Sequence, residues 1–364
     1  MKVNGRHYRS IWLNEDGWRV DIIDQTRLPH EFETVTLETL EDAARAIEIM
    51  QVRGAPLIGA TAAYGVCLGL REDASDAALE AADARLRRTR PTAINLMWAL
   101  DEMLATVRNL PREARLQAAY QRAAMLCDAD VETNAAIGRN GLKLIEKIAS
   151  GKSGETINIL THCNAGWLAT VDWGTALAPI YMAHDKGLPV HVWADETRPR
   201  NQGAALTAWE LGSHGVAHTI VVDNAGGHLM QRGLVDMVIT GTDRTAGNGD
   251  VCNKIGTYLK ALAASDNDVP FYVALPHSTI DWTVADGVRD IPIEQRGADE
   301  VTHLTGRAAS GEIVKVHVSA PGSGAGNPAF DVTPARLVNG LITERGVCNA
   351  STDGLLSLYP ERKA

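Results

Sequence analysis

From residue 155 onward, short apolar runs alternate with helical segments, and this alternation constrains the fold more than any other feature of the chain. Helical segments over about 175–186 and 202–211 separate the first of these runs. Strands that alternate with helices through short connections run parallel, with the helices as crossovers. The pattern therefore predicts an α/β domain built on a parallel sheet. Its predicted strands are Ile157–Thr161, Pro189–Ala194, Thr219–Val222, Val235–Ile239 and Phe271–Leu275.

Polar residues follow each predicted strand. The carboxyl ends of parallel strands share one edge of a sheet, and ligands of such sheets bind there, near the point where the strand order reverses. We therefore expect the functional site at this edge. The strand ends are 161–164 (THCN), 194–198 (ADETR), 223–226 (DNAG), 240–243 (TGTD) and 276–278 (PHS).

The first half of the chain has a different pattern. Tyr8–Leu13 and Trp18–Ile23 are predicted strands that flank a turn-forming sequence, Asn14–Gly17. The uncharged stretch Gly54–Leu70 is too short and too rich in small residues for a membrane span, which needs about 20 strongly apolar residues, so it predicts a buried helix. Further helices are predicted over 40–50, 94–107 and 112–148.

These patterns divide the chain of 364 residues into parts. At roughly 150 residues per domain, a chain of this length is expected to hold about two domains. We predict a mostly helical N-terminal domain over 1–125, with short strands at its start. A linking helix over 126–154 then leads to the parallel-sheet domain over 155–364.

Composition excludes several classes of function. The 35 Lys and Arg residues against 45 Asp and Glu give a formal net charge of −10, whereas nucleic-acid binders usually carry a basic patch. The five cysteines are scattered and never in CxxC spacing, which fits neither a disulfide framework nor a zinc site. The opening sequence MKVNGRHYRS lacks the apolar segment of a signal peptide. We expect a soluble protein of the reducing cytoplasm, with no nucleic-acid or membrane partner.

Two strand ends carry residues suited to acid–base chemistry. Cys163 stands before a glycine-containing turn into a predicted helix, and a helix N-terminus favours a thiolate. The alternative is a buried structural cysteine. Asp243 ends another strand and is a candidate general acid or base, with a helix cap or an ion pair to Arg244 as the alternatives. Position alone leaves both residues open.

Three sequences are candidates for holding an anion. Arg53 and Gly54 precede the apolar helix, and a glycine there allows the backbone to approach a ligand closely. Arg90 precedes another predicted helix. Asn253 and Lys254 are predicted to open a third, whose N-terminus attracts negative charge. For each arginine the alternative is a solvated surface charge.

Known nucleotide motifs do not account for these sequences. None of them matches GxxxxGK[ST]. The glycine-rich stretch 322–326 (GSGAG) follows the last predicted strand rather than a first strand, so we interpret it as a flexible loop instead of a dinucleotide site.

Eight strings, in order along the chain, resemble the methylthioribose-1-phosphate isomerase family, which is related to the α, β and δ subunits of the translation factor eIF2B. Eight long strings are far more specific than one short motif. They are VRGAPLIGATAAYG (52–65), RPTAINLMWAL (90–100), THCNAGWLAT (161–170), ADETRPRNQGAALTAWEL (194–211), GTDRTAGNGDVCNKIGTY (241–258), PHSTIDW (276–282), IPIEQR (291–296) and NPAFDVTP (327–334).

The resemblance implies a helical N-terminal domain, a Rossmann-like parallel-sheet domain and a homodimer. It implies conversion of 5-methylthio-α-D-ribose 1-phosphate to 5-methylthio-D-ribulose 1-phosphate in methionine salvage, with no metal or other cofactor. The 1-phosphate blocks the simple opening to a free aldehyde, so the ring must open with the phosphate in place. Two routes, a cis-phosphoenolate and a direct hydride shift, stay open.

The resemblance also implies roles for single residues. Cys163 matches the catalytic thiol, and Asp243 matches the acid–base carboxylate. Trp167 stands where the family commonly has a smaller residue, and we expect it to start a helix near the thiol and to shape the pocket around the 5-substituent. The matches in the substrate-binding segments are Arg53, Gly54, Ala55, Arg90, Gln202, Asn253 and Lys254.

Three other functions are weighed against this one. The 5-deoxy analogue, 5-deoxyribose 1-phosphate, lacks only the thiomethyl group and is a candidate second substrate. A ribose 1,5-bisphosphate isomerase would need further cations, and these strings offer only Arg198 and Arg200. A non-catalytic, eIF2B-like regulatory subunit that binds a sugar phosphate or a nucleotide need not keep both Cys163 and Asp243, and both are present.

Overall fold

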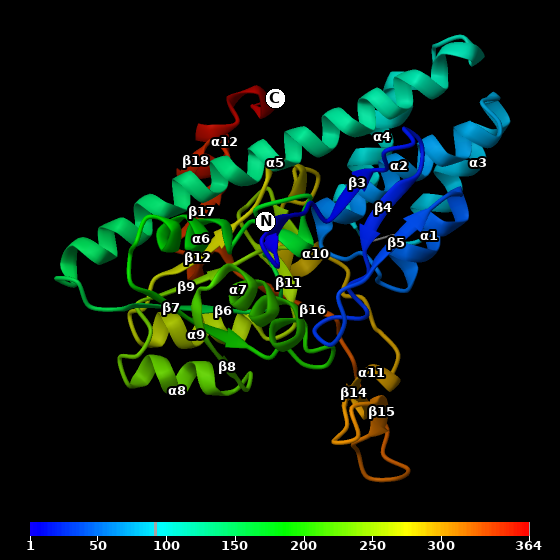
Figure 1. The fold of residues 1–364 in the computed structure, drawn as a ribbon. Coiled ribbons are helices and arrows are strands. Elements are labelled where there is room, and N and C mark those ends of the chain that lie inside the picture. Colours follow the sequence, from blue (N-terminus) through cyan, green and yellow to red (C-terminus); the bar gives the residue numbers. More distant parts are fainter. Residues whose placement is uncertain (91–92, 364) are drawn as a thin grey trace.

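The computed structural model describes residues 1–90 and 93–363, and its N-terminal region combines short strands with helices (Figure 1). A three-stranded antiparallel sheet has the order β3-β4-β5, and Leu13 faces Val20 across the predicted turn. The two strands predicted around Asn14–Gly17 are therefore confirmed. The strands of this region are β1 (Lys2–Val3), β2 (Arg6–His7), β3 (Ile11–Leu13), β4 (Val20–Ile23) and β5 (Thr34–Leu37).

Caps and prolines fix where the N-terminal helices begin. Thr39 and Asp42 form a capping box at the start of the first helix, and Ser75 accepts a hydrogen bond from the backbone of the third. Pro111 directly precedes the fifth helix. The helices are α1 (Leu40–Glu48), α2 (Ala55–Glu72), α3 (Asp76–Arg87), α4 (Ile94–Val107) and α5 (Arg112–Gly151).

Helix α2 is the centre of the N-terminal core. It is buried along nearly its whole length and contacts α1, α3, α4 and α5. A helix that is apolar on every side needs protein or lipid around it, and here protein surrounds it. The buried helix predicted over Gly54–Leu70 is confirmed. Across the described residues, no helix combines the length and the apolar character that a bilayer crossing requires.

Helix α5 connects the two halves of the molecule. It is one continuous helix of 40 residues that packs on α2 and α4 at one end and on the sheet domain at the other (Figure 1). The limit predicted between residues 125 and 126 falls inside it. The division into a helical domain, a linking helix and a sheet domain stays a proposal.

The main sheet has seven strands in the order β18-β17-β12-β9-β6-β7-β8. All neighbours from β17 to β8 are parallel, and only β18 is antiparallel. The α/β class and the parallel sheet predicted from the sequence are confirmed. The strands are β6 (Ile157–Thr161), β7 (Val190–Asp195), β8 (Ala217–Val221), β9 (Met237–Thr240), β12 (Phe271–Ala274), β17 (Gly340–Thr343) and β18 (Gly346–Cys348).

Helices cover both faces of this sheet. Figure 1 shows α8 and α9 on one face and α5 with α6 on the other. The predicted segment 202–211 forms a π-helical turn, Gly203–Thr207, that continues into α7. The helices are α6 (Ala178–Asp185), α7 (Ala208–His214), α8 (Ala225–Gln231), α9 (Thr257–Asp266) and α12 (Thr352–Leu358).

A second sheet and a hairpin complete the fold. The sheet has the order β13-β10-β11-β16, and the hairpin β14–β15 projects from the body together with α11 (Figure 1). Arg307 donates to the carbonyl of His30, which ties the hairpin to the N-terminal region. The elements are β10 (Arg244–Ala246), β11 (Val251–Lys254), β13 (Ile280–Asp281), α10 (Gly287–Asp290), α11 (Asp299–Thr302), β14 (His303–Arg307), β15 (Ile313–His317) and β16 (Phe330–Thr333).

Two local predictions were wrong, and a third was correct only in part. Only a 3₁₀ turn, Trp167–Ala169, follows Cys163, where a helix was expected. Asn253 and Lys254 end β11 instead of opening a helix, because the strand pairs with β10 and β16. The glycine-rich stretch 322–326 is a loop as predicted, but it lies between β15 and β16 and thus precedes three strands.

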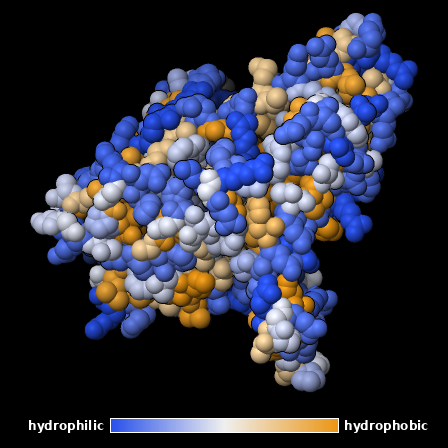
Figure 2. Space-filling view, viewed as in Figure 1, coloured by the Kyte–Doolittle hydropathy of each residue, from blue (hydrophilic) through white to orange (hydrophobic). Residues whose placement is uncertain are grey.

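Most of the surface in Figure 2 is hydrophilic, and its apolar residues form separate small groups. One such group lies on the projecting hairpin, where Val316 and the nearby Val318 are about half exposed. Isolated exposed apolar residues of this kind are ordinary for globular proteins.

Gly54→Ala is expected to destabilise the protein by about 2–4 kcal/mol, because it adds left-handed strain and a backbone clash. Gly54 has φ = 91°, and a Cβ there would lie 2.4 Å from the carbonyl oxygen of Ala169. Urea unfolding measures the change. Gly187→Ala is the control, since Gly187 has φ = 82° with nothing within 4 Å of a Cβ. Equal costs for the two variants would contradict the role of the Ala169 contact.

Candidate active site

A cavity of about 500 Å³ opens at the carboxyl edge of the main sheet. The N-terminal region, both sheets and the hairpin all contribute to its wall. Seven of the nine residues predicted for the site line it, namely Arg53, Gly54, Arg90, Cys163, Gln202, Asp243 and Lys254. The wall is completed by Gln25–His30, Ile49, Met50, Ile58, Pro199–Asn201, Ala205, Leu206, Arg296, Asp299, Glu300, His303–Thr305, Ile313, Lys315 and Phe330.

Cys163 occupies the sharp turn at the end of β6. Its φ of 71° lies in the left-handed region, which is strained for a residue with a Cβ. Its N–H donates to Thr197 Oγ1 at 2.8 Å, and its carbonyl accepts from Thr207 Oγ1 at 2.8 Å. These two hydroxyls hold the turn in place, so that the thiol is presented to the cavity.

The cysteine sulfur meets two hydrogen-bond donors. Gln202 Nε2 lies 3.5 Å from Sγ, and Arg53 Nη2 lies 3.8 Å from it. A guanidinium and an amide can both donate hydrogen bonds to a cysteine sulfur. The helix N-terminus expected beside the sulfur is absent, and side chains from two distant segments lie there instead.

Arg53 is itself held by a chain of hydrogen bonds that leads from the partly buried guanidinium into the core. Its Nη1 donates to Asn164 Oδ1 at 2.6 Å, and its Nη2 donates to the carbonyl of Asn164 at 3.2 Å. Asn164 Nδ2 in turn donates to Glu210 Oε1 at 2.8 Å. The guanidinium therefore has one orientation, and in that orientation it faces the sulfur.

Glu210 is the buried end of that chain. Besides Asn164, its carboxylate accepts from the Tyr181 hydroxyl and from the backbone N–H groups of Trp167 and Leu168. Burial raises the pKa of Glu210 to about 7, against the opposing effect of these donors. The carboxylate holds together the segment that follows Cys163.

Asp243 lies between β9 and β10, with its N–H bonded to the carbonyl of Cys252 at 2.9 Å. Burial raises the pKa of its carboxyl above the ordinary value, while the charges of Lys254, Arg53 and Arg90 oppose that rise. A carboxyl with a raised pKa is suited to carry a proton near neutral pH. Arg244, considered as its ion-pair partner, pairs with Asp281 at 3.6 Å.

Lys254 and Arg90 bring positive charge into the cavity. Lys254 is 7% exposed and places its ammonium 4.8 Å from the ring centre of Phe330. Arg90 Nη2 lies 3.7 Å from Glu294 Oε2, and its buried Nε has no hydrogen-bond partner among the described residues. Burial lowers the pKa of both groups. An anion in the cavity would stabilise both charged forms.

The helix N-terminus near Lys254 is occupied by a side chain of the protein itself. The carboxylate of Asp331 accepts from the N–H groups of Gly256 and Tyr258, at 2.7 Å and 3.1 Å, and so occupies the start of α9. Asn253 is buried and donates to Thr257 Oγ1 at 3.0 Å; it is not among the residues that line the cavity.

Two other predicted residues lie away from the cavity. Ala55 is the buried first residue of α2, directly behind Gly54. Trp167 is 1% exposed and packs near Trp209, with ring centres 6.1 Å apart, instead of shaping the pocket. Its bulk is accommodated by the core, because the turn after Cys163 sends this side chain away from the lining.

Sequence reasoning missed several contributors. Asn164, Thr197 and Glu210 lie within the matching strings, but only the contacts of the fold show what they do. Glu294 lies in the string IPIEQR, which received no role. Gln25–His30 and the hairpin carried no motif at all.

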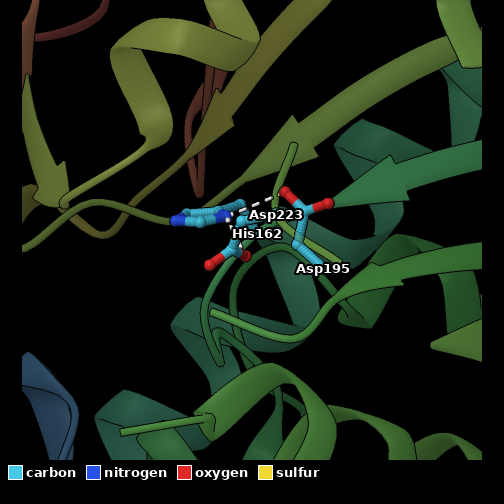
Figure 3. Close-up of side chains that lie close together, drawn as sticks. All are labelled: His162, Asp195 and Asp223. Atoms are coloured by element: carbon cyan, nitrogen blue, oxygen red, sulfur yellow. Dashed lines mark hydrogen bonds and ion pairs between the residues drawn. The ribbon is translucent and has the colours of Figure 1, made fainter. Parts of the chain in front are cut away.

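Of the residues the structure describes, one group has the spacing of a metal site: His162, Asp195 and Asp223, whose ligand atoms lie within 4.8 Å of one another (Figure 3). Lys260 places its ammonium 3.1 Å from Asp195 Oδ2. This ammonium supplies the positive charge that a metal ion would bring, so we interpret the group as an ion-pair cluster, with Asp223 at its partly exposed side.

Comparisons with known proteins agree with one another. Residues 51–350 match the family model described as Initiation factor 2 subunit family. The chain is 67% identical to a methylthioribose-1-phosphate isomerase of Brucella anthropi and 66% identical to one of Sinorhizobium medicae, with full coverage of both chains in each case.

Two solved structures have similar folds and different names. A 5-methylthioribose 1-phosphate isomerase from Pyrococcus horikoshii has a TM-score of 0.83 at 37% identity, covering 98% of this chain and 97% of the other. The delta subunit of translation initiation factor eIF-2B from A. fulgidus has a TM-score of 0.79 at 36% identity, covering 97% and 100%.

Asp243→Asn is expected to stabilise the protein at neutral pH. The pKa of Asp243 is raised in the fold, so the native state binds its proton more tightly than the unfolded chain does. The stability of the parent protein therefore falls as pH rises from the ordinary carboxyl value through the raised one. The asparagine of the variant does not titrate, so the variant does not lose this stability. The difference in stability between the variant and its parent disappears at low pH.

Thermal unfolding between pH 4 and 8 measures this difference. Asp299→Asn is the control, because Asp299 lines the same cavity but is exposed. An Asp243→Asn protein that is less stable than its parent at pH 7 would show that the three cations outweigh burial.

Proposed function

Because this chain belongs to the Initiation factor 2 subunit family, as one of its methylthioribose-1-phosphate isomerases, we propose that it converts 5-methylthioribose 1-phosphate to 5-methylthioribulose 1-phosphate. The observation that carries the proposal is one cavity that holds Cys163, Asp243 and three buried or half-buried cations. Acid–base groups and cations are what the isomerisation of a sugar phosphate needs.

The charges of the cavity suit one phosphate group. Arg53, Arg90 and Lys254 face the cavity, and the backbone at Gly54 allows close approach. The remaining arginines of the wall are paired with glutamates: Arg27 with Glu31, Arg200 with Glu300, and Arg296 with Glu294 and Glu300. Arg198, the other cation considered for a second phosphate, donates to the carbonyls of Pro199 and Val301. The pairing of these arginines favours a monophosphate over a bisphosphate substrate, and Lys315, which also lines the wall, is exposed on the hairpin.

Asp243 is suited to protonate the ring oxygen as its bond to C1 breaks. In the phosphoenolate route, Cys163 as a thiolate takes the proton from C2, and a proton returns to C1 while the C2 hydroxyl loses one. In the hydride route, the hydrogen moves from C2 to C1 with its electrons, and the C2 hydroxyl loses its proton. In each route the sugar gains as many protons as it loses, so two protein groups that exchange protons with it are sufficient.

Apolar side chains on one part of the wall suit the 5-methylthio group. These are Leu28, Ile49, Met50, Ile58 and Leu206, all of which line the cavity. An apolar pocket distinguishes a sugar with the 5-methylthio group from one with hydrogen in its place only weakly, because one missing methylene in such a pocket changes the free energy by about 1–3 kcal/mol. We therefore also propose 5-deoxyribose 1-phosphate as a second substrate.

A regulatory role is the second candidate function, since the eIF-2B delta subunit has nearly the same fold. The joint presence of Cys163, its two donors and Asp243 favours the enzyme. A binding subunit needs the cations of the cavity but has no need for an oriented thiol.

We further propose a homodimer located in the cytoplasm. Strand β8 forms one edge of the main sheet, and Ile220 and Val222 at that edge are 49% and 59% exposed. An open strand edge with exposed apolar residues is a common pairing surface. Light scattering measures the mass of the protein in solution, and the mass of a single chain would exclude the dimer.

Cys163→Ser is expected to lower turnover by about 10²–10⁴-fold with folding intact, because a serine hydroxyl is far less acidic than a thiol. A ketose assay on 1-phosphorylated pentoses that differ only at C5 measures turnover and substrate preference together. Cys127→Ser is the control, since Cys127 is buried in α5, away from the lining. Full activity of a folded Cys163→Ser protein would remove the thiol from the reaction.

Lys254→Met is expected to raise KM for the sugar phosphate by roughly 10-fold or more, since a charge-assisted contact contributes about 1.5–3 kcal/mol. Methionine keeps the apolar length over Phe330 and removes only the charge. Inhibition by inorganic phosphate is expected to weaken in parallel. Lys143→Ala, at an exposed position on α5, is the control. An unchanged inhibition constant for phosphate would place the phosphate elsewhere.

A further inference from the structure

The residue next to the reactive thiol faces away from the cavity into a buried charged cluster. His162 is 1% exposed, and its ring joins the ends of separate elements of the sheet domain. Nδ1 lies 2.9 Å from Asp195 Oδ2 at the end of β7 and 3.9 Å from Asp223 Oδ1 after β8. Nε2 lies 2.8 Å from the carbonyl oxygen of Ile255, directly after Lys254.

Both nitrogens of this ring meet groups that only accept hydrogen bonds. Figure 3 shows the carboxylates of Asp195 and Asp223 beside one nitrogen, with the other nitrogen directed away from them. A backbone carbonyl has no hydrogen to give, and the Asp195 carboxylate is held as an acceptor by the ammonium of Lys260. A neutral imidazole donates from only one nitrogen, whereas an imidazolium donates from both.

Over the four side chains His162, Lys260, Asp195 and Asp223, the charges balance when the ring is an imidazolium. His162 and Lys260 are then positive, and Asp195 and Asp223 are negative. Asp223 is fully engaged, since its two oxygens accept from the N–H groups of Thr197 and Arg198. From the side of β16, burial raises the pKa of Asp331, and the backbone N–H groups of Gly256 and Tyr258 oppose that rise. Buried charges are tolerated when they are paired in this way.

The cluster connects the two sides of the cavity. Thr197 accepts from the N–H of Cys163 and follows Asp195 closely in the chain, so the Asp195 side of the ring is linked to the thiol. On its other side, the ring contacts the carbonyl of Ile255, which directly follows Lys254 in the chain. Gly256 has φ = 102°, and a Cβ there would lie 3.0 Å from the ring, so this segment passes the imidazole at close range.

We propose that His162 is a positioning residue: a doubly donating imidazolium that fixes the distance between the thiol of Cys163 and the ammonium of Lys254. His162 does not line the cavity. It acts through Cys163, which follows it in the chain, and through Ile255, whose carbonyl it contacts beside Lys254. Only the kinetic consequence rests on the proposed function. The double donation and the reactivity of the thiol are measured without a substrate.

The first test is ¹⁵N NMR of the histidine-labelled full-length protein in neutral buffer, with His162→Gln used to assign the signal. We expect a directly bonded proton on each ring nitrogen of His162. His191 is the internal reference for a neutral ring, because burial lowers its pKa. A single protonated ring nitrogen on His162 would overturn the proposal.

The second test uses His162→Asn and His162→Gln. Asparagine can reach only the Asp195 side, and glutamine only the Ile255 side, so each variant cuts one connection. Both are expected to lower kcat/KM by about 10²-fold, since small misplacements at a site have effects of this size. The alkylation rate of Cys163 by iodoacetamide, followed by mass spectrometry, is expected to change in both.

The control is His218→Gln, because His218 lies on β8 and meets one carbonyl, that of Val216. Its kcat/KM and thiol reactivity are expected to stay within about twofold of the parent. Folded His162 variants with parental thiol reactivity and kcat/KM would overturn the positioning role. So would the failure of both variants to fold, which would assign His162 to stability alone. A parent protein without isomerase activity would instead contradict the proposed function and leave the NMR and alkylation results valid.

Discussion

The arrangement of the cavity depends on one strained turn, the left-handed backbone at Cys163, which two threonine hydroxyls hold from either side. Such a conformation costs a residue with a Cβ roughly 1–2 kcal/mol, so it persists only where its surroundings fix it. The turn sends three consecutive side chains in different directions. His162 enters the ion-pair cluster, Cys163 faces the cavity, and Asn164 reaches Glu210 and Arg53. One backbone angle thereby links the thiol to both of its supporting networks.

Burial of charge is the second constraint. The chain is acidic overall, with a net charge of −10, yet the cavity gathers cations. Burial lowers the pKa of Lys254 and Arg90 and raises that of Asp243, so each of these groups is pushed toward its neutral form. A bound phosphate would favour the charged lysine and arginine and would favour the protonated form of Asp243. In the proposed reaction, substrate binding would therefore favour the acid form of Asp243, because the same negative charge acts on all three groups.

Sequence patterns predicted the parts of this structure that depend on local chemistry. Apolar runs such as Ile157–Thr161 gave the parallel strands, and the polar residues after them gave the edge that holds Cys163 and Asp243. Sequence patterns failed where contacts between residues far apart in the chain determine the local structure. The start of α9 is occupied by Asp331, which lies more than 70 residues away in the chain, and Asn253 joins a strand because β10 and β16 flank it. No local signal shows that Glu210 orients Arg53, since that connection exists only through Asn164 in the folded chain.

The fold alone does not decide the chemistry. Structures named as a methylthioribose 1-phosphate isomerase and as an initiation factor subunit resemble this chain almost equally, with TM-scores of 0.83 and 0.79. A parallel sheet that gathers polar strand ends can bind a phosphate without transforming it, and cations are enough for that. Isomerisation also requires groups that exchange protons at fixed places. Three features of the site cost free energy: the strained turn at Cys163, the two donors at its sulfur and the desolvated carboxyl of Asp243. A protein that only binds a phosphate does not need them, whereas a protein that moves protons does.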